Sequence, residues 1–519
     1  MINSSVSIII VHWNTPDVLK AQLKLLCGFE GEIIVVDNNS ADNVDWIKNE
    51  FSKVKFIQNK INHGYAFACN QGASIAVGEW LLFLNPDVSI SIEQVLQFLN
   101  GAVEQRLDVA SPNINQSGYQ KPIPTFWSLI HEFTPLGKII PFSPKKRTLF
   151  GGCLLIKKRI LEKVGGWDER FFVWFEDSDL TKRLYDNNYR VGWIDSEITH
   201  SGAESFKIID PTTQSDMFFH SMRMYMKKHF LVFQQLIIEF IIQRYSNKKL
   251  LPVLDDSISI VVPNMKRALL DSFLKLNCRF IKPPIELVIV TSILSNYDFF
   301  TYKRDYPLVR FIRISENRGF ASTVNVGLKI SRGQWTGTAN DDTVWTSNWI
   351  LQCLDNAPVR SGSINPLIFD REGSVESAGI QIFPQGKATP ITILPTENIT
   401  TIDATNGAAV VYKHEVLENV GLYDERFGSY LEDVDLSLRI TKLGYTNCVV
   451  TNAKITHLKH QTTLSRVPVF KSWNDFKNWI LIIAKNWDAG SIITNFPPIL
   501  IERGRNLSGV IKSLFERSR

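Results

Sequence analysis

The sequence predicts an α/β protein made of two tandem domains, each with a mostly parallel, Rossmann-like sheet, followed by a short helical segment. The first observation is length, because 519 residues allow two or three domains of ordinary size. The second is that short β-branched runs alternate with segments of helical apolar spacing, as in sheets covered by helices. The third is that the chain repeats its motifs, in order, at an almost constant separation.

The repeat keeps its register along most of each copy. The first apolar run, Ser7 to Val11, returns 252 residues later as Ser259 to Val262. The separation then drifts only as far as 257 residues, between His200 and His457. Such a long period excludes a solenoid and indicates two copies that differ by small insertions. The predicted parts are domain 1, domain 2 and a helical, basic amphipathic C-terminal segment, at residues 1–245, 256–470 and 471–519.

The expected strands are continuous apolar runs, and helices separate them. A parallel sheet buried on both faces has strands of this kind. In such sheets ligands bind beyond the carboxyl ends of the strands, so the residues just after each run are expected to carry the chemistry. The clearest strands are expected at 6–11, 32–37, 80–84, 258–262 and 286–290, and helices at 18–26 and 66–76.

Composition and charge narrow the class of protein. Hydrophobic residues make up 44% of the chain and aromatic residues 11%, which is enough to bury a core. The 57 basic and 52 acidic side chains leave a net charge of only +5, so no nucleic-acid partner is expected. Six dispersed cysteines without a CxxC pair suit reduced thiols. Without a signal-peptide pattern or a long apolar span, the protein is expected to be cytoplasmic.

Asp37 is the last residue of the second predicted strand and directly follows its apolar run at 33–36. It is a candidate acceptor for an N–H group of a bound ligand. The alternative is that Asp37 and the following Asn38 to Ser40 form a polar turn that caps the next helix.

Asp87 follows a buried strand within the sequence Asn85-Pro86-Asp87. A carboxylate there is costly to desolvate unless a cation or a donor compensates it. The second copy has Asp341 and Asp342 at the same place. This duplication favours metal binding by Asp87, Asp341 and Asp342 over a plain turn, because Mg²⁺ or Mn²⁺ is held by few carboxylates together with substrate phosphates.

Three acids within Glu176 to Asp179 follow an aromatic run. The preference of helix N-termini for acids explains Asp179. The aromatic neighbours point instead to a carboxylate in this group whose pKa is tuned toward that of a general base. The second copy repeats Glu176 and Asp177 as Glu432 and Asp433.

His200 and His457 end β-like runs at matching places in the two copies. A single histidine is more often structural than a ligand. Its recurrence 23 residues after Asp177 and 24 residues after Asp433 favours a metal ligand, since neutral imidazole binds Mn²⁺. His12, Asn70 and its counterpart Asn325 complete the candidate substrate-binding residues.

These motifs, in this order and in both copies, resemble glycosyltransferase family 2, the inverting transferases of the glycosyltransferase-A fold. The resemblance implies that Asp37 contacts the nucleotide base, that Asp87 is the acid of a variant DxD motif and that Asp177 is the catalytic base. His200 would be a further ligand near the metal and the diphosphate. In the second copy these roles fall to Asp341, Asp342, Asp433 and His457. Glu176, and Glu432 in the second copy, would hydrogen-bond the acceptor or the donor sugar as substrate-binding residues.

The resemblance also implies the cofactor and the partners. The cofactor is Mn²⁺ or Mg²⁺, the donor is a nucleotide-sugar, and the acceptor is a glycan linked to polyprenyl diphosphate. The sequence around Asp37 and Asp87 is similar to the rhamnosyltransferase-like branch, which implies dTDP-rhamnose or a UDP-hexose as the donor. The product expected is a bacterial surface polysaccharide of the O-antigen or capsule type.

The second copy departs from this pattern where the base-contacting acid stands in the first. Its strand at 286–290 ends in Thr291, which lacks the charge of Asp37. Two hypotheses follow: a bifunctional transferase, or one active domain beside a degenerate copy that binds acceptor or is structural. A dehydrogenase or nucleotidyltransferase is disfavoured, because no glycine-rich loop follows the first strand.

Two segments raise the question of a membrane surface. Residues 230–244 form an apolar stretch with one narrow polar stripe, and this helix is expected to pack between the two copies. Residues 499–519 form a basic amphipathic helix that either lies on an anionic leaflet or presents a solvated basic face. The first alternative for this tail predicts peripheral contact with the inner face of the cell membrane.

Overall fold

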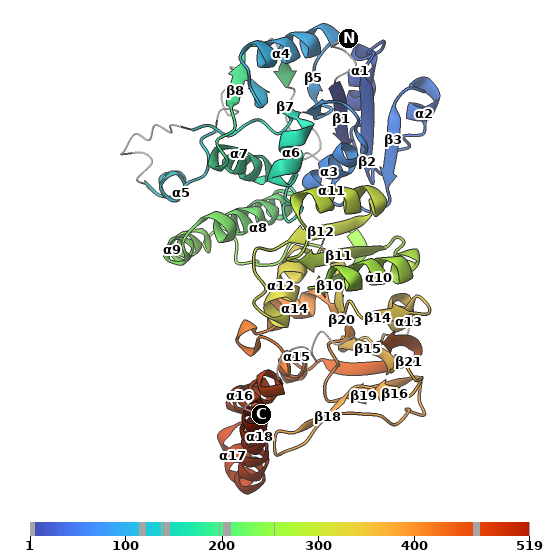
Figure 1. Cartoon of the computed structure of the whole chain (residues 1–519), viewed down its shortest axis with the longest axis vertical. Helices are drawn as coiled ribbons and strands as arrows, with labels where there is room; N and C mark the ends of the chain where they lie inside the picture. The colour runs from blue at the N-terminus through green and yellow to red at the C-terminus, as the bar shows by residue number, and fades with distance from the viewer. Residues whose placement is uncertain are drawn as a thin grey trace. The chain divides into compact units, whose positions relative to one another are not determined.

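The structure is a computed structural model, and its description covers residues 6–113, 121–135, 139, 146–196, 198–200, 209–253, 255–355, 357–459 and 468–517. The chain forms two compact units, called here the first unit and the second unit (Figure 1). The first unit comprises Met1–Pro252 and Leu294–Phe311, and the second comprises Val253–Ile293 and Ile312–Arg519.

The first unit is built on a seven-stranded sheet with the order β3-β2-β1-β4-β7-β6-β8. Its central strand β1 (Val6–His12) is fully buried and pairs in parallel with both neighbours. Strands β3, β2, β1 and β4 are mutually parallel, whereas β7 runs antiparallel to β4 and β6. The prediction of a mostly parallel sheet is therefore confirmed, and the parallel strands bring their carboxyl ends to one edge.

Helices and further strands complete the first unit. The elements from β1 to β5 are β1 (Val6–His12), α1 (Pro16–Leu25), β2 (Glu32–Asn38), α2 (Trp46–Glu50), β3 (Lys55–Asn59), α3 (Tyr65–Ile75), β4 (Trp80–Leu84) and β5 (Val88–Ser89). Those that follow are α4 (Ile92–Glu104), β6 (Val109–Pro112), α5 (Phe126–Phe133), β7 (Cys153–Lys157), α6 (Lys158–Val164), α7 (Glu176–Asp186), β8 (Val191–Ile194), β9 (Thr199–His200), α8 (Pro211–His229), α9 (Val232–Ile242) and α11 (Asn296–Asp305).

The second sheet repeats the first strand by strand. Its order is β12-β11-β10-β13-β20-β15-β21-β14, with β16 and β19 added at β15 and β21. The long strand β21 (Thr446–His457) replaces both β8 and β9, and its pairing of His457 with Thr343 matches the pairing of His200 with Val88. The tandem repeat predicted from the sequence is confirmed at the level of topology.

The second unit contains more strands than the first. Its elements up to α13 are β10 (Asp255–Asn264), α10 (Arg267–Asn277), η4 (Cys278–Phe280), β11 (Ile285–Thr291), β12 (Val309–Arg313), α12 (Phe320–Ile330), β13 (Gly333–Ala339), β14 (Thr343–Trp345) and α13 (Trp349–Asp355). The later ones are β15 (Ser361–Phe369), β16 (Val375–Ser377), β17 (Ile380–Ile382), β18 (Ala388–Pro390), β19 (Ile399–Ile402), β20 (Ala409–Lys413), α14 (His414–Val420), η5 (Glu425–Phe427), α15 (Glu432–Lys442), β21 (Thr446–His457), α16 (Pro468–Asn486), α17 (Ala489–Thr494) and α18 (Phe496–Arg517).

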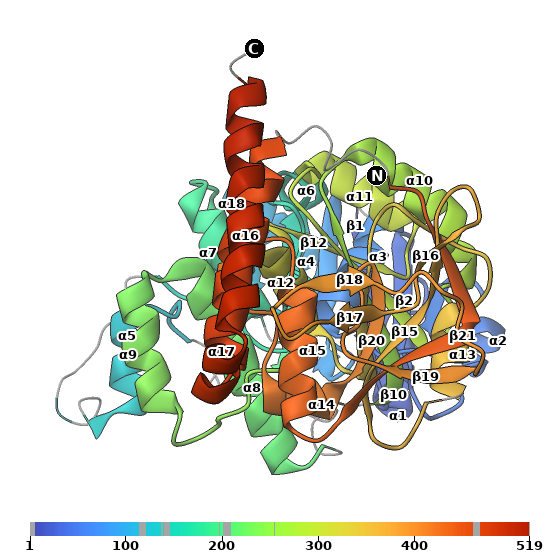
Figure 2. The ribbon, with the colours of Figure 1, turned by 90° about the horizontal axis from the view of Figure 1, so that it is seen from below.

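The second copy extends past residue 470, the boundary expected from the sequence. Helices α8 (Pro211–His229) and α16 (Pro468–Asn486) have equal lengths, and both their ends are 257 residues apart. Helix α18 lies alongside α16 (Figure 2). The part of the chain from 471 to 486 is thus a counterpart of α8, and the segment without a long helical counterpart begins after it.

Residues 294–311 belong to the first unit, although they lie within the second copy in sequence. Lys303 of α11 is fully buried, with its Nζ 3.0 Å from Oε1 of the equally buried Glu169. The guanidinium of Arg310 donates hydrogen bonds to the carbonyl oxygens of Glu169 and His63, at 2.8 and 2.7 Å. Removing one partner of such a buried ion pair is strongly destabilising. We therefore expect residues 1–252 to depend on residues 294–311.

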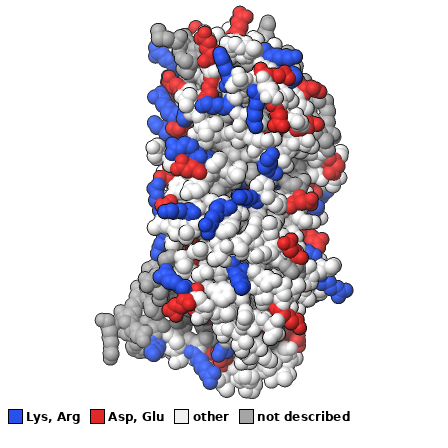
Figure 3. Space-filling view, turned by 90° about the vertical axis from the view of Figure 1, so that its right-hand side faces the viewer, with Lys and Arg blue, Asp and Glu red and all other residues white. Residues whose placement is uncertain are grey.

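The distribution of charge and the character of the helices bear on what the protein can bind. On the face shown in Figure 3, basic and acidic side chains are interspersed, as the near balance of 57 and 52 charges requires. Among the helices of the described ranges, none is both long and apolar enough to cross a membrane.

Candidate active sites

The ends of β1 and β2 bring His12 and Asp37 together in the first unit. The two residues are register partners, and Nδ1 of His12 lies 2.9 Å from Oδ1 of Asp37, with both side chains fully buried. The N–H of Thr15 donates to Nε2 of His12 at 3.1 Å, so the proton is on Nδ1 and is donated to Asp37. The hydroxyl of Ser40 also donates to Asp37, at 2.6 Å. The carboxylate of Asp37 therefore accepts hydrogen bonds from the residues around it. Its contact with a nucleotide base stays a prediction.

The same place in the second unit has a different polar pair. Asn264 and Thr291 are the register partners there, and the hydroxyl of Thr291 donates to Oδ1 of Asn264 at 3.2 Å. The amide of Asn264 in turn donates to Oδ2 of Asp341 at 2.8 Å. The charged pair of the first unit is replaced by a neutral pair that is tied to the predicted metal acid.

A carboxylate and an imidazole meet at each predicted metal site. Nε2 of His200 lies 3.2 Å from Oδ2 of Asp87, because the pairing of β5 with β9 brings these strand ends together. In the second unit Nε2 of His457 lies 3.1 Å from Oδ1 of Asp342. The structure thus places the acid and the histidine of each unit next to each other. The sequence shows only that both residues recur in the second copy.

The second site contains an additional acid that sequence reasoning missed. Oε1 of Glu376 lies 3.0 Å from Nδ1 of His457. Burial lowers the pKa of His457, but the hydrogen bonds that its ring donates to the carboxylates of Asp342 and Glu376 outweigh this effect and raise that pKa to about 9. Burial and the charge of Asp342 raise the pKa of Asp341 to about 7. No motif marks Glu376, which lies 81 residues before His457 in the chain.

The donor set fits a divalent ion that is completed by substrate. Within the described residues, no three or more His, Cys, Asp or Glu side chains gather in an arrangement that could hold a metal ion. One carboxylate and one imidazole, as at Asp87 and His200, leave most of an octahedral shell to water and phosphate oxygens. Mg²⁺ and Mn²⁺ in nucleotide sites commonly have such shells.

The predicted base in each unit follows a strained turn. Trp174 and Phe175 have φ angles of 64° and 65°, and their counterparts Tyr430 and Leu431 have 75° and 66°. Bulky residues in the left-handed region cost about 1–3 kcal/mol each, and such strain clusters at functional sites. The turn starts α7 at Glu176 and so places Asp177 at the first turn of that helix.

A glycine loop packs against the predicted base in both units. A β-carbon on Gly151 would lie 3.1 Å from Cβ of Asp177, and one on Gly407 would lie 3.3 Å from Oδ2 of Asp433. The N–H of Gly407 donates to Asp433 at 2.8 Å, and the N–H of Ser178 donates to Asp177 at 2.6 Å. Any side chain at either glycine would crowd the carboxylate.

Burial raises the pKa of all four acids in these pairs. In the first unit burial and the charge of Asp177 raise the pKa of Glu176 to about 8, and burial raises that of Asp177 in spite of hydrogen bonds from Ser178. In the second unit burial likewise raises the pKa values of Glu432 and Asp433. The increase in pKa expected from the aromatic run is thus present in both units. It is present even in the second unit, where other residues replace that run.

Substituting Glu176 with glutamine is expected to change how stability depends on pH. The folded-state pKa of about 8 lies above the ordinary value of 4.5, so the folded protein binds the extra proton and loses stability as pH rises between those values. Glu176→Gln removes this loss, at most about 1.4 kcal/mol per pH unit. We expect the unfolding temperature of the variant to gain on wild type from pH 6 to pH 8. An unchanged difference across this range would contradict the raised pKa.

The structure surrounds the predicted substrate-binding asparagines with protein. Nδ2 of Asn70 donates to the carbonyl of Trp167 at 2.8 Å and to Glu169 at 3.0 Å, while its Oδ1 accepts from the N–H of Trp167 at 2.9 Å. Nδ2 of Asn325 donates to the carbonyl of Tyr423 at 2.8 Å. Both side chains are buried, which favours a structural role over the predicted contact with substrate.

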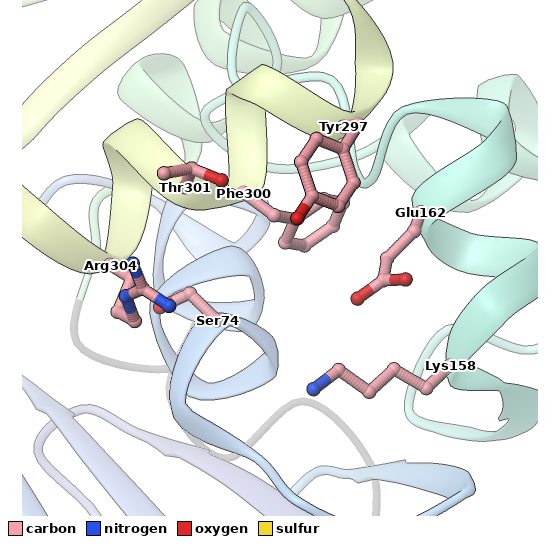
Figure 4. Close-up of a pocket in the computed structure, with 7 residues that line it drawn as sticks. All are labelled: Ser74, Lys158, Glu162, Tyr297, Phe300, Thr301 and Arg304. Carbon is pink, nitrogen blue, oxygen red and sulfur yellow. The ribbon is translucent and has the colours of Figure 1, made fainter.

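A separate hollow of about 170 Å³ lies in the first unit (Figure 4). It is lined by α3, α6 and α11, and none of the strand-end acids described above contributes to it. Its lining residues are Ser74, Lys158, Glu162, Tyr297, Phe300, Thr301 and Arg304.

The comparisons with known proteins agree with this geometry. The model of the family described as glycosyl transferase family 2 matches residues 7–165 and 260–374, which together are just over half of the chain. A second model, described as the N-terminal domain of galactosyltransferase, matches residues 141–203. The family model thus covers most of β1, the second half of β10, and the acids that follow β4 in the first unit and β13 in the second.

Two curated relatives match part of the chain. A low-salt glycan biosynthesis hexosyltransferase of Haloferax volcanii, Agl10, is 27% identical over 36% of this chain and 63% of its own length. An N-acetylglucosaminyl-diphospho-decaprenol L-rhamnosyltransferase of Mycobacterium tuberculosis is 28% identical over 30% of this chain and 61% of its own length. The chain therefore spans about three-fifths of the length of these relatives.

Among solved structures, the mannosyltransferase PcManGT from Pyrobaculum calidifontis, in complex with GDP-Man and Mn²⁺, is 12% identical and has a TM-score of 0.35. The match covers 59% of this chain and 86% of that one. At this TM-score the likeness carries no conclusion about this chain.

Proposed function

The chain belongs to glycosyl transferase family 2, and we propose that each of its two units transfers a sugar from a nucleotide-sugar to a growing bacterial surface polysaccharide of the O-antigen or capsule type. The observation that carries this proposal is the recurrence, in both units, of an acid–histidine pair and a buried acid pair after matching strands. A degenerate copy that only supports the fold has no evident need for either arrangement.

In the first unit, Asp177 would take the proton from the acceptor hydroxyl as that oxygen attacks the anomeric carbon. Its raised pKa brings it closer to the range in which a carboxylate is an effective general base. Attack from the face opposite the leaving group gives inversion. Glu176, protonated over much of the neutral range, would donate a hydrogen bond to a sugar oxygen.

Asp87 and His200 would hold the divalent ion, Mn²⁺ or Mg²⁺, that binds the donor diphosphate. When bound, this ion offsets the charge that develops on the leaving nucleoside diphosphate. Asp342 and His457 would hold the ion in the second unit, with Asp341 beside them. The second-unit pair has its additional contact with Glu376, so the two sites are expected to differ in metal affinity.

The two units are proposed to prefer different nucleotides. The pair of His12 and Asp37 presents a charged acceptor for a base N–H, and we propose dTDP-rhamnose or a UDP-hexose as its donor. The pair of Asn264 and Thr291 presents neutral groups only. The same substitution supports the second candidate function, in which the second unit is a module that binds acceptor or is structural.

We also propose peripheral contact with the inner face of the cell membrane, where a polyprenyl-diphosphate-linked acceptor would be found. Helix α9 exposes 72% of Val232, 66% of Leu236 and 81% of Phe240. Arg244 and Lys248 are exposed beyond its end. An apolar face beside basic residues suits an anionic lipid surface. Phe240→Glu should then abolish co-flotation with phosphatidylglycerol vesicles, and unchanged flotation would count against contact through α9.

Release of nucleoside diphosphate tests the proposed activity. Purified chain with Mn²⁺ is supplied with UDP- and dTDP-sugars and a polyprenyl-diphosphate-linked acceptor mimic. Wild type is expected to release nucleotide from at least one donor, and the double variant Asp177→Asn/Asp433→Asn is expected to release none. Equal release by the double variant would show that these acids are not the bases.

A further inference from the structure

Each unit holds the helix that carries its predicted base against a second helix, α8 or α16. The base-carrying helices are α7 (Glu176–Asp186) and α15 (Glu432–Lys442). Both begin with the acid pair, and two residues after the base each has a fully buried aspartate, Asp179 or Asp435. Helix dipoles favour acids at these places but do not supply the cations that a fully buried carboxylate requires.

In the first unit a single lysine bridges this aspartate to a second one. Nζ of Lys228, on α8, lies 2.6 Å from Oδ1 of Asp179 and 2.6 Å from Oδ2 of Asp168. His229 and Arg183 also contact Asp179, with Nε2 at 2.7 Å and Nε at 2.8 Å. Burial raises the pKa of Asp179, but the charges of Arg183 and Lys228 and the hydrogen bond with His229 outweigh it and hold that pKa well below its usual range.

The second unit repeats the bridge with different neighbours. Nζ of Lys485, on α16, lies 2.8 Å from Oδ1 of Asp435 and 2.6 Å from Oδ2 of Asp424. Arg439 again contacts the buried aspartate, with Nε at 2.9 Å, but an asparagine, Asn486, takes the place of the histidine. The arginine and the bridging lysine are therefore the constant members, and the two lysines are 257 residues apart.

The same two helices also bond the strained turn before the base. The hydroxyl of Ser221, on α8, donates to the carbonyl of Val173 at 2.7 Å. At the matching position on α16, Nδ2 of Asn478 donates to the carbonyls of Ser429 and Tyr430 at 3.0 and 2.7 Å. Backbone in the left-handed region persists only when its surroundings hold it there. Each turn is thus held by hydrogen bonds from a helix other than the one that it starts.

We propose that Lys228 and Lys485 are positioning residues that fix the first turn of α7 and α15, and with it Asp177 and Asp433, in the geometry required for transfer. This inference rests on the proposed function. The lysines reach neither acid of the catalytic pair; they act through Asp179 and Asp435, which lie half a turn further along the same helices. A displacement of about 1 Å at a reacting group can reduce turnover on the order of 100-fold.

The test compares Lys228→Met and Lys485→Met in the full chain, with Lys227→Met as the matched control. Lys227 is the exposed neighbour of Lys228 on α8. We expect Lys228→Met to lower kcat about 10- to 100-fold for the transfer that depends on Asp177, with the KM for the donor within about twofold of wild type. The transfer that depends on Asp433 should be unchanged, which shows that the chain is folded. Lys485→Met should give the converse pattern.

Two further readouts keep the inference open to refutation. Lys228→Arg, which retains the cation, should lie nearer to wild type than Lys228→Met. Hydrogen exchange of the amides from 173 to 178 should be faster in Lys228→Met than in Lys227→Met, a measurement that needs no substrate. Unchanged kcat and exchange in Lys228→Met would overturn the positioning role, whereas silence of wild type on all donors would overturn the proposed function instead.

Discussion

Asp177→Asn is expected to reduce kcat of the first unit by about 10²- to 10⁴-fold, which is the usual contribution of a general base. The amide can keep the hydrogen bond from the N–H of Ser178, which lies 2.6 Å from the carboxylate, but it cannot accept the proton of the acceptor. Donor binding should change little, because the substitution preserves shape. The measurement is steady-state nucleotide release at saturating acceptor mimic, over a range of pH.

The role of Asp177 as a base also predicts how kcat of the wild type depends on pH. A base must be deprotonated, so kcat should fall as pH falls through the pKa of Asp177, which burial places above its ordinary value of 3.8. Asp186→Asn is the matched control, because Asp186 is exposed at the far end of the same helix. Asp186→Asn should keep the wild-type kcat. Retention of wild-type kcat by Asp177→Asn as well would exclude Asp177 as the base.

Asp87→Ala is expected to abolish the response of the first unit to Mn²⁺ and to lower its turnover by about 10²- to 10⁴-fold. A divalent ion contributes several kcal/mol of charge stabilisation to departure of a diphosphate, and Asp87 is the carboxylate that lies 3.2 Å from His200 at this site. Electron paramagnetic resonance of bound Mn²⁺ in the presence of the nucleotide gives a readout that does not depend on turnover.

The control for this substitution is Glu93→Ala, at an exposed acid in the first turn of α4. It should bind Mn²⁺ and release nucleotide as wild type does. If Asp87→Ala instead retains both Mn²⁺ binding and full turnover, the acid–histidine pair is a structural contact and not a metal site.

The sequence predicts the strand ends well because parallel strands buried on both faces are continuous apolar runs. The apolar run before Asp37 ends at Val36, two residues before the end of β2, and the register pairs Asp37 with His12. The duplication then marks the candidate functional residues, because the same acids recur after matching apolar runs in both copies. The order of the central strands is the same in both sheets, as two copies of one domain require.

Residues that act through long-range contacts could not be predicted in this way. Glu376 reaches His457 from strand β16, which has no named counterpart in the first sheet. Lys485 lies beyond the expected end of the second copy, because the repeated motifs stop at His457. That α16 is the counterpart of α8 becomes visible only from the buried ion pairs that both helices make. The grouping of 294–311 with the first unit likewise depends on contacts between residues far apart in the chain, such as the buried pair of Lys303 with Glu169 and the hydrogen bond from Arg310 to the carbonyl of His63.

The central claim is that both units work, and the product made by Asp433→Asn tests it most directly. The full chain is incubated with Mn²⁺, the donors that wild type uses and the lipid-linked acceptor mimic, and product length is read by mass spectrometry. We predict that Asp433→Asn and Asp177→Asn each stop the product at a different length or each lose the use of a different donor. If Asp433→Asn gives the wild-type products while Asp177→Asn gives none, the second unit is not a transferase and the claim is wrong.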